Sequence, residues 1–273
     1  MTDQFFTRPD VAADCLRLFH ETVDVPGDAC FVEPSAGAGA FFDLLPPAKR
    51  IGLDLEPRHA AVPQDDFFLW TPPERPCVVV GNPPFGKRGR LAVRFVRRSL
   101  EFAESVGMIL PMTFTRYETH RLLPAGARLA LSVPLSPDSF VLPTGEPYAV
   151  RTVFQVWTSA PGETDHRLRA PLPTKHPDFD MWQYNNTPEA LRHFDEPFEF
   201  AVPCQGWQDY SRRETNPDAC EKSKQWMLLR PLTDWAHRLL WNLDYERLAH
   251  QAQTATPGFR KGTLVEAYKA AKC

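Results

Sequence analysis

Short apolar runs alternate with helix-like segments from residue 10 to about residue 157. The runs are typical of strands that are buried on both faces. We expect strands at residues 29–33, 50–54, 77–81, 106–111, 129–134 and 150–157, and helices at 10–19, 39–45, 91–104 and 114–123. This alternation predicts an α/β fold with a mostly parallel sheet covered by helices on both faces. Ligands of such sheets bind at the carboxyl ends of the strands.

The pattern changes beyond about residue 160, where loops and isolated aromatic residues precede two helix-like segments at 233–251 and 262–272. We therefore expect one domain over residues 1–160 and a small C-terminal accessory or target-recognition region over 161–273. Trp182 and Tyr184 are of the type that stacks on bases, but packing in a core is the commoner role for such residues.

Composition narrows the classes of function. A formal net charge of −3 over 273 residues excludes a globally basic nucleic-acid binder, so any such role requires a local basic patch. No apolar run approaches the ~18 residues of a membrane span, and the start MTDQFFTRPDV does not have the pattern of a signal peptide. The six cysteines form no CxxC pair, which favours reduced thiols over disulfides or a metal site. We expect a cytoplasmic protein, monomeric or weakly dimeric, without metal.

The stretch CFVEPSAGAGAFF places Gly37 and Gly39 between an expected strand and a helix, where a GxG turn lets the backbone approach a nucleotide-like ligand. Phe42 stands where the dinucleotide fingerprint has its third glycine. Glu33, at the tip of the strand, repels a pyrophosphate but suits a ligand with an ammonium and a sulfonium. A GxG by itself is equally compatible with a plain tight turn.

Acidic residues follow in an order that supports a cofactor site. Asp54 ends the next expected strand, seventeen positions after Gly37, near the spacing at which a carboxylate binds ribose hydroxyls. Leu55 then lies against an adenine ring, while Asp66 accepts from the adenine amino group and Phe67 packs on the ring. Each feature alone is more often a surface turn or a core aromatic, but together they predict S-adenosylmethionine as the cofactor.

The segment PCVVVGNPPFGKRG, residues 76–89, ends a buried run with two prolines that cannot donate to a β-ladder. The chain therefore leaves the sheet here and forms a loop at the carboxyl end of a strand. If the Asn82 side-chain oxygen and the Pro83 carbonyl each accept one N–H bond of a planar amine, its lone pair is freed to attack a methyl group. Pro84 stiffens the loop, and Phe85 offers a ring on which a base stacks.

These motifs resemble one family. FFTRPDVAADC, VEPSAGAGAF, GLDLEP, DDFFLW, GNPPFG and GMILPMTF follow one another as in the gamma-class N6-adenine DNA methyltransferases, over about residues 5–157. The resemblance implies a Rossmann-like methyltransferase domain with a mostly parallel seven-stranded sheet. It also implies methyl transfer to the adenine N6 of DNA after base flipping, in the setting of restriction and modification.

The resemblance also assigns residues. The catalytic set that it implies is Asn82, Pro83, Pro84 and Phe85. The cofactor-binding set is Thr7, Glu33, Pro34, Ser35, Ala36, Gly37, Gly39, Asp54, Leu55, Asp66, Phe67 and Asn82. Phe140 matches the family's second ring-stacking position, with core packing as an equal alternative.

A basic segment follows the NPPF loop, with no acidic residue before Glu101. We expect phosphate contacts from Lys87, Arg88, Arg90 and Arg94, and ordinary surface roles for Arg97 and Arg98. We predict that catalysis falls steeply with salt, with a slope near −3 if about three phosphates of duplex DNA are contacted.

Other functions stay open at this point. An RNA adenine or guanine-N2 methyltransferase is favoured by Phe85, because tyrosine is commoner at that position in the DNA enzymes. Protein glutamine-N5 methylation uses the same two acceptors, but the arginine-rich segment argues against it. A non-catalytic nucleic-acid-binding module is a further alternative. The Pro-Cys-Gln at 203–205 is similar to the nucleophile motif of cytosine-C5 enzymes, but Asn82 occupies the loop where that thiolate would stand, so we expect Cys204 to be structural.

Overall fold

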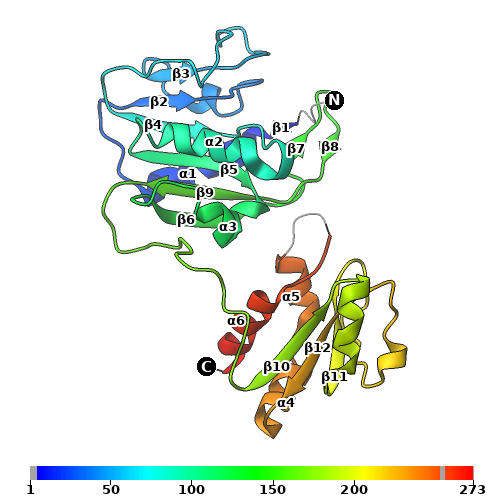
Figure 1. Cartoon of the computed structure of the whole chain (residues 1–273). Helices are drawn as coiled ribbons and strands as arrows, with labels where there is room; N and C mark the ends of the chain where they lie inside the picture. The colour runs from blue at the N-terminus through cyan, green and yellow to red at the C-terminus, as the bar shows by residue number, and fades with distance from the viewer. Residues whose placement is uncertain (1–4, 253–255, 273) are drawn as a thin grey trace. The chain divides into compact units, whose positions relative to one another are not determined.

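The computed structural model describes residues 5–252 and 256–272 and divides into two compact units between Arg169 and Ala170 (Figure 1). The division lies nine residues after the expected boundary at 160/161, because residues 161–169 are held by unit 1. The Arg167 guanidinium donates to five carbonyls at the end of the α3 helix (Tyr117–His120) and in the residues after it, those of His120, Leu123, Pro124, Ala125 and Ala127.

Unit 1 is built on a six-stranded sheet. From one edge to the other its strands are β3 (Arg50–Gly52), β2 (Cys30–Glu33), β4 (Cys77–Gly81), β5 (Ser105–Pro111), β9 (Thr152–Thr158) and β6 (Arg128–Pro134). The first four run parallel, and β9 is antiparallel to both of its neighbours. The expected α/β class and the mostly parallel sheet are therefore confirmed. All six strands expected from the sequence are present within one or two residues of their predicted bounds.

The seven-stranded sheet that the resemblance implies is wrong for the part of the chain that the structure describes, since this sheet has six strands. The segment after β3 makes only a single parallel bridge, between Asp54 and Gln64. Pro63 has no N–H to offer a ladder, and the Asp65 and Asp66 carboxylates accept hydrogen bonds from the backbone of the following turn. These local bonds replace the pairing that a further strand would need.

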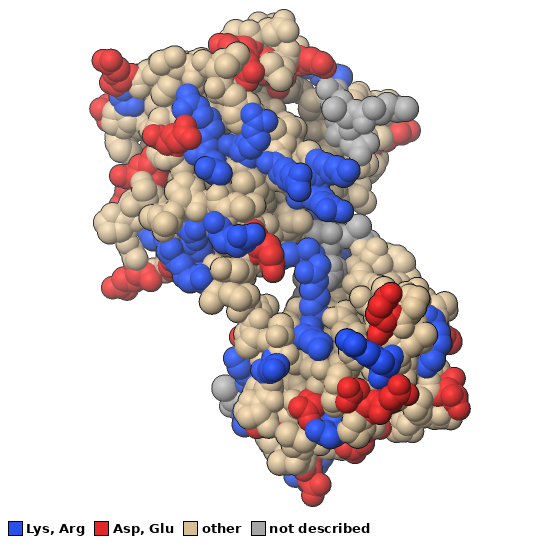
Figure 2. All heavy atoms as spheres, viewed as in Figure 1, with Lys and Arg blue, Asp and Glu red and all other residues tan. Residues whose placement is uncertain are grey.

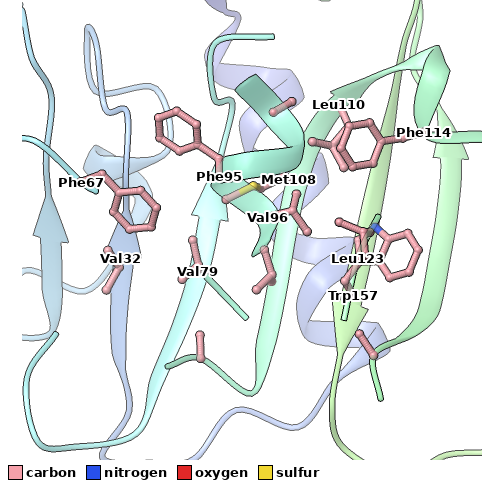
Figure 3. Packing of buried hydrophobic residues seen from close by; sticks show 14 of the residues in the cluster. Val32, Phe67, Val79, Phe95, Val96, Met108, Leu110, Phe114, Leu123 and Trp157 are labelled. Atoms are coloured by element: carbon pink, nitrogen blue, oxygen red, sulfur yellow. The ribbon is translucent and has the colours of Figure 1, made fainter. Parts of the chain in front are cut away.

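Alternate residues of the central strands enter two separate cores. Val79 and Met108 lie on the face covered by α2 (Arg90–Ser99), whereas Val78 and Ile109 lie on the face covered by α1 (Pro9–Thr22). Figure 3 shows the first of these cores, where Phe95 and Val96 of α2 pack over the sheet. Burial on both faces explains why these strands read as continuous apolar runs in the sequence.

The strand order has a switch point between β2 and β4. From β2 the chain continues to β3 on one side, and it then returns to form β4 on the other side of β2. Crevices at the carboxyl ends of strands on either side of such a reversal are where open α/β sheets bind ligands. The loops after Glu33 and Gly81 both begin at this point.

Several helices differ from their expected bounds. The segment 39–45 holds only the 3₁₀ turn η1 (Phe42–Leu44), and 114–123 divides into η3 (Met112–Thr115) and α3 (Tyr117–His120). The segment 233–251 forms two helices, α4 (Asp234–Trp241) and α5 (Tyr245–Ala252). The break follows from side chains that bond the backbone, since Asn242 donates to the Arg238 carbonyl and Asp244 accepts from the Arg247 N–H.

A small second sheet of unit 1 was not expected. It consists of β1 (Phe6–Thr7), β7 (Phe140–Val141) and β8 (Pro147–Tyr148), each of two residues and paired antiparallel. Strands this short show no readable periodicity. They bring the first described residues beside the chain near residue 140.

Unit 2 contains a three-stranded antiparallel sheet, with β12 (Gln225–Pro231) between β10 (Phe179–Tyr184) and β11 (Phe200–Gln205). The core on one face includes residues of α4, α5 and α6 (Lys261–Lys272), and the core on the other face includes Ala190 of η4 (Pro188–Asp195). The short turn η5 (Pro217–Ala219) precedes β12. None of the helices in the described ranges is long and apolar enough to span a membrane.

Candidate active site

A cavity of about 820 Å³ opens in unit 1 where the residues after β2, β3 and β4 meet. Its volume lies within the range of small-molecule sites. Eleven of the twelve predicted cofactor residues and all four predicted catalytic residues line it. The exception is Gly39, whose left-handed backbone (φ +90°) faces His59, 2.8 Å from where a Cβ would stand. Gly39 therefore shapes the loop without lining the cavity.

The glycine loop is held by Asp54. The Gly37 N–H donates to Asp54 Oδ2 at 2.7 Å, and the Glu56 N–H donates to Oδ1 at 2.8 Å. Gly37 has φ +51°, and a Cβ there would meet the Phe6 ring at 3.2 Å. The sequence assigned Asp54 to a ribose. The carboxylate does line the cavity, and its two oxygens keep acceptor sites beyond these two bonds.

Glu33 is a buried carboxyl group at the end of β2, with 2% of its surface exposed. Its Oε2 has no hydrogen-bond partner within the described chain. Burial raises the pKa of Glu33 well above its ordinary value of 4.5, and the nearby Asp54 and Asp43 carboxylates raise it further, while the Phe42 backbone N–H lowers it. A buried, unpartnered carboxyl oxygen at a cavity wall fits a cationic group of a ligand.

The NPPF loop begins where β4 ends at Gly81, which has φ +151°. A Cβ at Gly81 would lie 3.1 Å from Glu33 Cγ, so the close approach of the two loops depends on glycine. The Asn82 amide nitrogen donates to Thr7 Oγ1 at 3.1 Å. Asn82 Oδ1 is buried and has no partner among the described residues. The loop thus presents a fixed, unused acceptor.

Phe85 is joined to α2 by its backbone, because its carbonyl accepts from the N–H groups of Leu91 at 3.1 Å and Ala92 at 3.3 Å. Its ring is half-buried and meets the Phe5 ring edge to face at 5.5 Å. Phe5 in turn stacks on Tyr148 of β8 at 5.2 Å. Three aromatic side chains from distant segments therefore form one wall of the cavity.

Phe140 is not part of that wall. Its side chain is fully buried in the core under α1, where it packs edge to face on Phe5 at 4.9 Å. The structure thus places it in the core, the alternative that the sequence left open, and it has no exposed face for a base. Sequence reasoning missed Phe5, Phe6 and Tyr148, because Phe6 and Tyr148 belong to two-residue strands and Phe5 directly precedes one. The turn residues Gly145 and Pro147 before Tyr148 are the one signal that could have located it.

The acidic segment after β3 lines the cavity as predicted, although its side chains also serve the fold. Asp66 Oδ1 accepts from the Phe68 N–H at 2.8 Å. The Phe67 ring is 2% exposed and stacks on Phe95 at 5.3 Å, so it contributes to the core as well as to the cavity wall. Leu55, in contrast, is 61% exposed at the rim.

Of the predicted phosphate-binding residues, only Lys87 lines the cavity. Lys87 and Arg88 belong to the 3₁₀ turn η2 (Lys87–Gly89), and Arg90 and Arg94 belong to α2. All four side chains are exposed. Figure 2 shows Lys and Arg side chains gathered on the face of unit 1 that α2 covers.

The structure argues against Cys204 as a nucleophile. Cys204 lies in β11 of unit 2, is fully buried and has its pKa raised by burial to about 12. Tyr184 is also buried and donates to the Lys222 carbonyl, which confirms the core role expected for it. No group of three or more His, Cys, Asp or Glu within residues 5–252 and 256–272 is placed to hold a metal ion.

Comparison with known proteins gives distant likenesses only. No family model and no curated protein matches the chain. Among solved structures, a protein of Pyrococcus horikoshii described as an RNA methyltransferase is 17% identical, with a TM-score of 0.44, covering 57% of this chain and 87% of its own. The 23S rRNA methyltransferase ErmE is 16% identical, with a TM-score of 0.40, covering 62% and 72%.

A Listeria monocytogenes protein described as a class I S-adenosylmethionine-dependent methyltransferase is 10% identical, with a TM-score of 0.43, covering 59% of this chain and 62% of its own. None of the three is described as a DNA methyltransferase. At TM-scores below 0.5 these likenesses carry no argument about activity. The function proposed below therefore rests on the residues of the cavity.

Proposed function

We propose that this chain transfers a methyl group from S-adenosylmethionine to the exocyclic amino group of an adenine in a nucleic acid. The observation that carries the proposal is a pair of buried oxygens in one cavity, Glu33 Oε2 and Asn82 Oδ1, which find no hydrogen-bond partner within residues 5–252 and 256–272. One suits a cation, and the other suits an N–H donor. Glu33 is the last residue of β2 and Asn82 directly follows β4, the strands on either side of the switch point of the sheet.

The residues of the cavity fit the cofactor. Glu33 would accept from the ammonium of the methionine part, Asp54 from the ribose hydroxyls and Asp66 from the adenine amino group, with Leu55 against the adenine ring. When bound, S-adenosylmethionine supplies a methyl group activated by the positive charge on its sulfur. The Gly37 turn keeps the backbone close to this space without a side chain in the way.

The amine of the substrate would be held by Asn82 Oδ1 and the Pro83 carbonyl, each accepting one N–H bond. Such acceptance stabilises a nitrogen that is becoming tetrahedral more than it stabilises the planar amine, so it lowers the barrier. The Thr7 hydroxyl oxygen accepts a hydrogen bond from the amide nitrogen of Asn82. This bond would orient the amide so that its oxygen, Asn82 Oδ1, is the atom that meets the substrate. Pro83 and Pro84 restrict the backbone, so that the acceptors are in position before the base arrives.

The aromatic wall provides for the ring of the base. Extracting a base from a stack costs a few kcal/mol, and stacking on one aromatic side chain returns about 1–3 kcal/mol. Phe85 and Tyr148 are the side chains of the wall that we assign to this contact, with Phe5 supporting both.

DNA is the substrate that the family resemblance implies, and RNA is the second candidate. The observation that favours RNA is Phe85 itself, since its ring cannot donate the hydrogen bond of the tyrosine that is commoner in the DNA enzymes. Both polymers therefore belong in the first assay.

That assay uses S-adenosylmethionine labelled in its methyl group and, separately, duplex DNA, single-stranded DNA, structured RNA and a protein extract. The expected product is N6-methyladenosine or its deoxy form, identified after digestion to nucleosides. Asn82→Ala should abolish transfer while cofactor affinity stays within about twofold, and Asn185→Ala, at an exposed position of unit 2, should act like the wild type. Label in glutamine instead of a base, or full activity of Asn82→Ala, would refute the proposal.

A further inference from the structure

The loop before α2 and the exposed side of α2 carry five exposed basic side chains. We propose that Lys87, Arg88, Arg90, Arg94 and Arg97 bind successive phosphates of the strand whose base enters the cavity. We call these residues the basic row. The inference rests on the proposed function for the identity of that base, and it adds Arg97, which the sequence had assigned to ordinary surface.

Helix geometry aligns the row. Arg90, Arg94 and Arg97 are spaced four and three residues apart, so they share one side of α2, and all three are exposed. At a rise of about 1.5 Å per residue they cover ~10 Å along the helix axis. Each strand of duplex DNA has one phosphate per about 3.4 Å of axis, so the helical part of the row matches roughly three phosphates.

The fold supplies no counter-charge for these residues. No ion pair in the described part of the chain includes a member of the basic row, although Arg98, one residue further, pairs with Glu101 at 2.8 Å and donates to the Trp70 carbonyl. The first turn of α2 contains no acidic residue and begins with Arg90. Because a helix N-terminus carries partial positive charge, cations there are disfavoured, and a bound anion would remove the penalty.

Arg88 adds an independent observation. It has φ +57°, in the left-handed region, where glycine is favoured, and its neighbours Gly86 and Gly89 have φ +65° and +75°. The Arg88 side chain is exposed and forms no bond with the rest of the described chain. Because a glycine at this position would avoid the backbone strain, the arginine does not stabilise the fold. Its presence therefore indicates that the Arg88 side chain binds something other than the protein itself.

The row begins at the cavity. Lys87 lines it, and the Arg94 guanidinium lies 4.4 Å from the ring centre of Phe68, another lining residue. The Phe85 carbonyl binds the first turn of α2 through Leu91 and Ala92. A phosphate bound by the basic row would therefore lie at a fixed distance from the Phe85 ring, on which the base would stack.

Fluorescence anisotropy with short labelled single-stranded RNA, single-stranded DNA and duplex DNA tests the row without using activity. The triple variant Arg90→Gln, Arg94→Gln, Arg97→Gln should bind at least tenfold more weakly at about 50 mM salt, and the slope of log affinity against log salt should shrink by about 2–3. Arg75→Gln is the matched control, because Arg75 is exposed and precedes β4 at the strand end opposite the cavity. It should leave affinity and slope unchanged.

Arg88→Gly separates binding from folding. Its midpoint in urea should equal or exceed that of the wild type, since glycine adopts the left-handed backbone without penalty, while the salt slope should fall by about 0.7–0.9. A structural role for Arg88 predicts a lower midpoint instead.

Wild-type affinity and slope in the triple variant would overturn the proposal, as would binding to polyglutamate as tight as binding to the oligonucleotides, which points to an acidic protein partner. Calorimetry with S-adenosylmethionine separates the two levels of inference. If cofactor binding is absent while the triple variant still loses oligonucleotide binding, the row stands and the proposed activity fails. If the cofactor binds while the row variants bind oligonucleotide normally, the row fails and the proposed activity stands.

Discussion

The amide nitrogen of Asn82 lies 3.1 Å from the hydroxyl oxygen of Thr7, and this bond joins the loop after β4 to the strand β1 at the start of the described chain. Thr7 is 6% exposed, so the pair is shielded from bulk water. The contact fixes the orientation of the Asn82 amide, with the nitrogen toward Thr7 and the oxygen left to accept from another group. This positioning role for Thr7 differs from the cofactor contact that the family resemblance implies.

Replacing Thr7 by valine should therefore slow transfer rather than weaken cofactor binding. Loss of one neutral hydrogen bond of about 0.5–1.5 kcal/mol corresponds to a decrease of roughly 2- to 13-fold in kcat. Thr7→Ser keeps the hydroxyl and should stay near the wild type. An increase in KM for S-adenosylmethionine with unchanged kcat would instead show that Thr7 contributes to cofactor binding.

Binding of the cofactor should be coupled to the release of a proton from Glu33. Because burial raises its pKa, the free protein holds a proton on Glu33 at pH values where an exposed glutamate has lost it. A cation bound beside Glu33 favours the ionised form, so binding should release a proton, and affinity should rise with pH until the raised pKa is passed. Calorimetry in buffers of different ionisation enthalpy measures this release, which Glu33→Gln should abolish.

The same pKa shift has a consequence for folding. A carboxyl group whose folded pKa is raised stabilises the folded state below its ordinary pKa of 4.5, and this contribution is lost as pH rises toward the folded value. The free energy of unfolding of Glu33→Gln minus that of the wild type should therefore grow over this range. A difference that does not change with pH would show that Glu33 ionises normally in the fold.

Gly81→Ala should destabilise the protein and impair the site together. The new methyl group would lie 3.1 Å from Glu33 Cγ, on a backbone with φ +151°. We expect a loss of about 1–3 kcal/mol in urea unfolding and weaker cofactor binding. Gly126→Ala is the control, since a Cβ there meets nothing within 4 Å and should leave stability within about 0.5 kcal/mol.

Cys204→Ala should retain the wild-type rate of methyl transfer. The thiol is fully buried, and its pKa of about 12 leaves almost no thiolate at neutral pH. Peptide mapping after brief alkylation of the folded protein should find Cys204 unmodified. Inactivation of a folded Cys204→Ala protein would contradict this prediction and would indicate that Cys204 acts as a nucleophile.

The parts of the fold that could be predicted from the sequence are those governed by local periodicity. The run Val78–Val79–Val80 is apolar at every position because its side chains alternate between two cores. The strand and the loop after it could therefore be predicted from the sequence. The β10–β12–β11 sheet of unit 2 was not, because Asp180, Gln183 and Pro203 interrupt the apolar pattern, and only pairing across distant segments makes these residues strands.

The same division holds for the site. Glu33 and Asp54 end predicted strands and Asn82 directly follows one, so their common location could be inferred from the rule that parallel strands share a carboxyl edge. Phe5 and Tyr148 were missed, because Tyr148 belongs to a two-residue strand and Phe5 directly precedes one, and such strands form only through tertiary pairing. Thr7 was predicted to line the site, but its bond to Asn82 depends on the same pairing. Phe140 and Tyr148 are directly opposite each other in β7 and β8 and share a face of that small sheet, so the packing around them, which spacing does not reveal, decides that Phe140 is buried while Tyr148 lines the cavity.

The pairing of β1 with β7 has a practical consequence for how this protein is prepared. Phe5 lines the cavity, so an affinity tag fused to the amino terminus would introduce foreign residues within five positions of the cavity wall. A tag on the carboxyl terminus extends unit 2 instead. Assays of substrate preference should therefore use carboxyl-terminal or cleaved fusions.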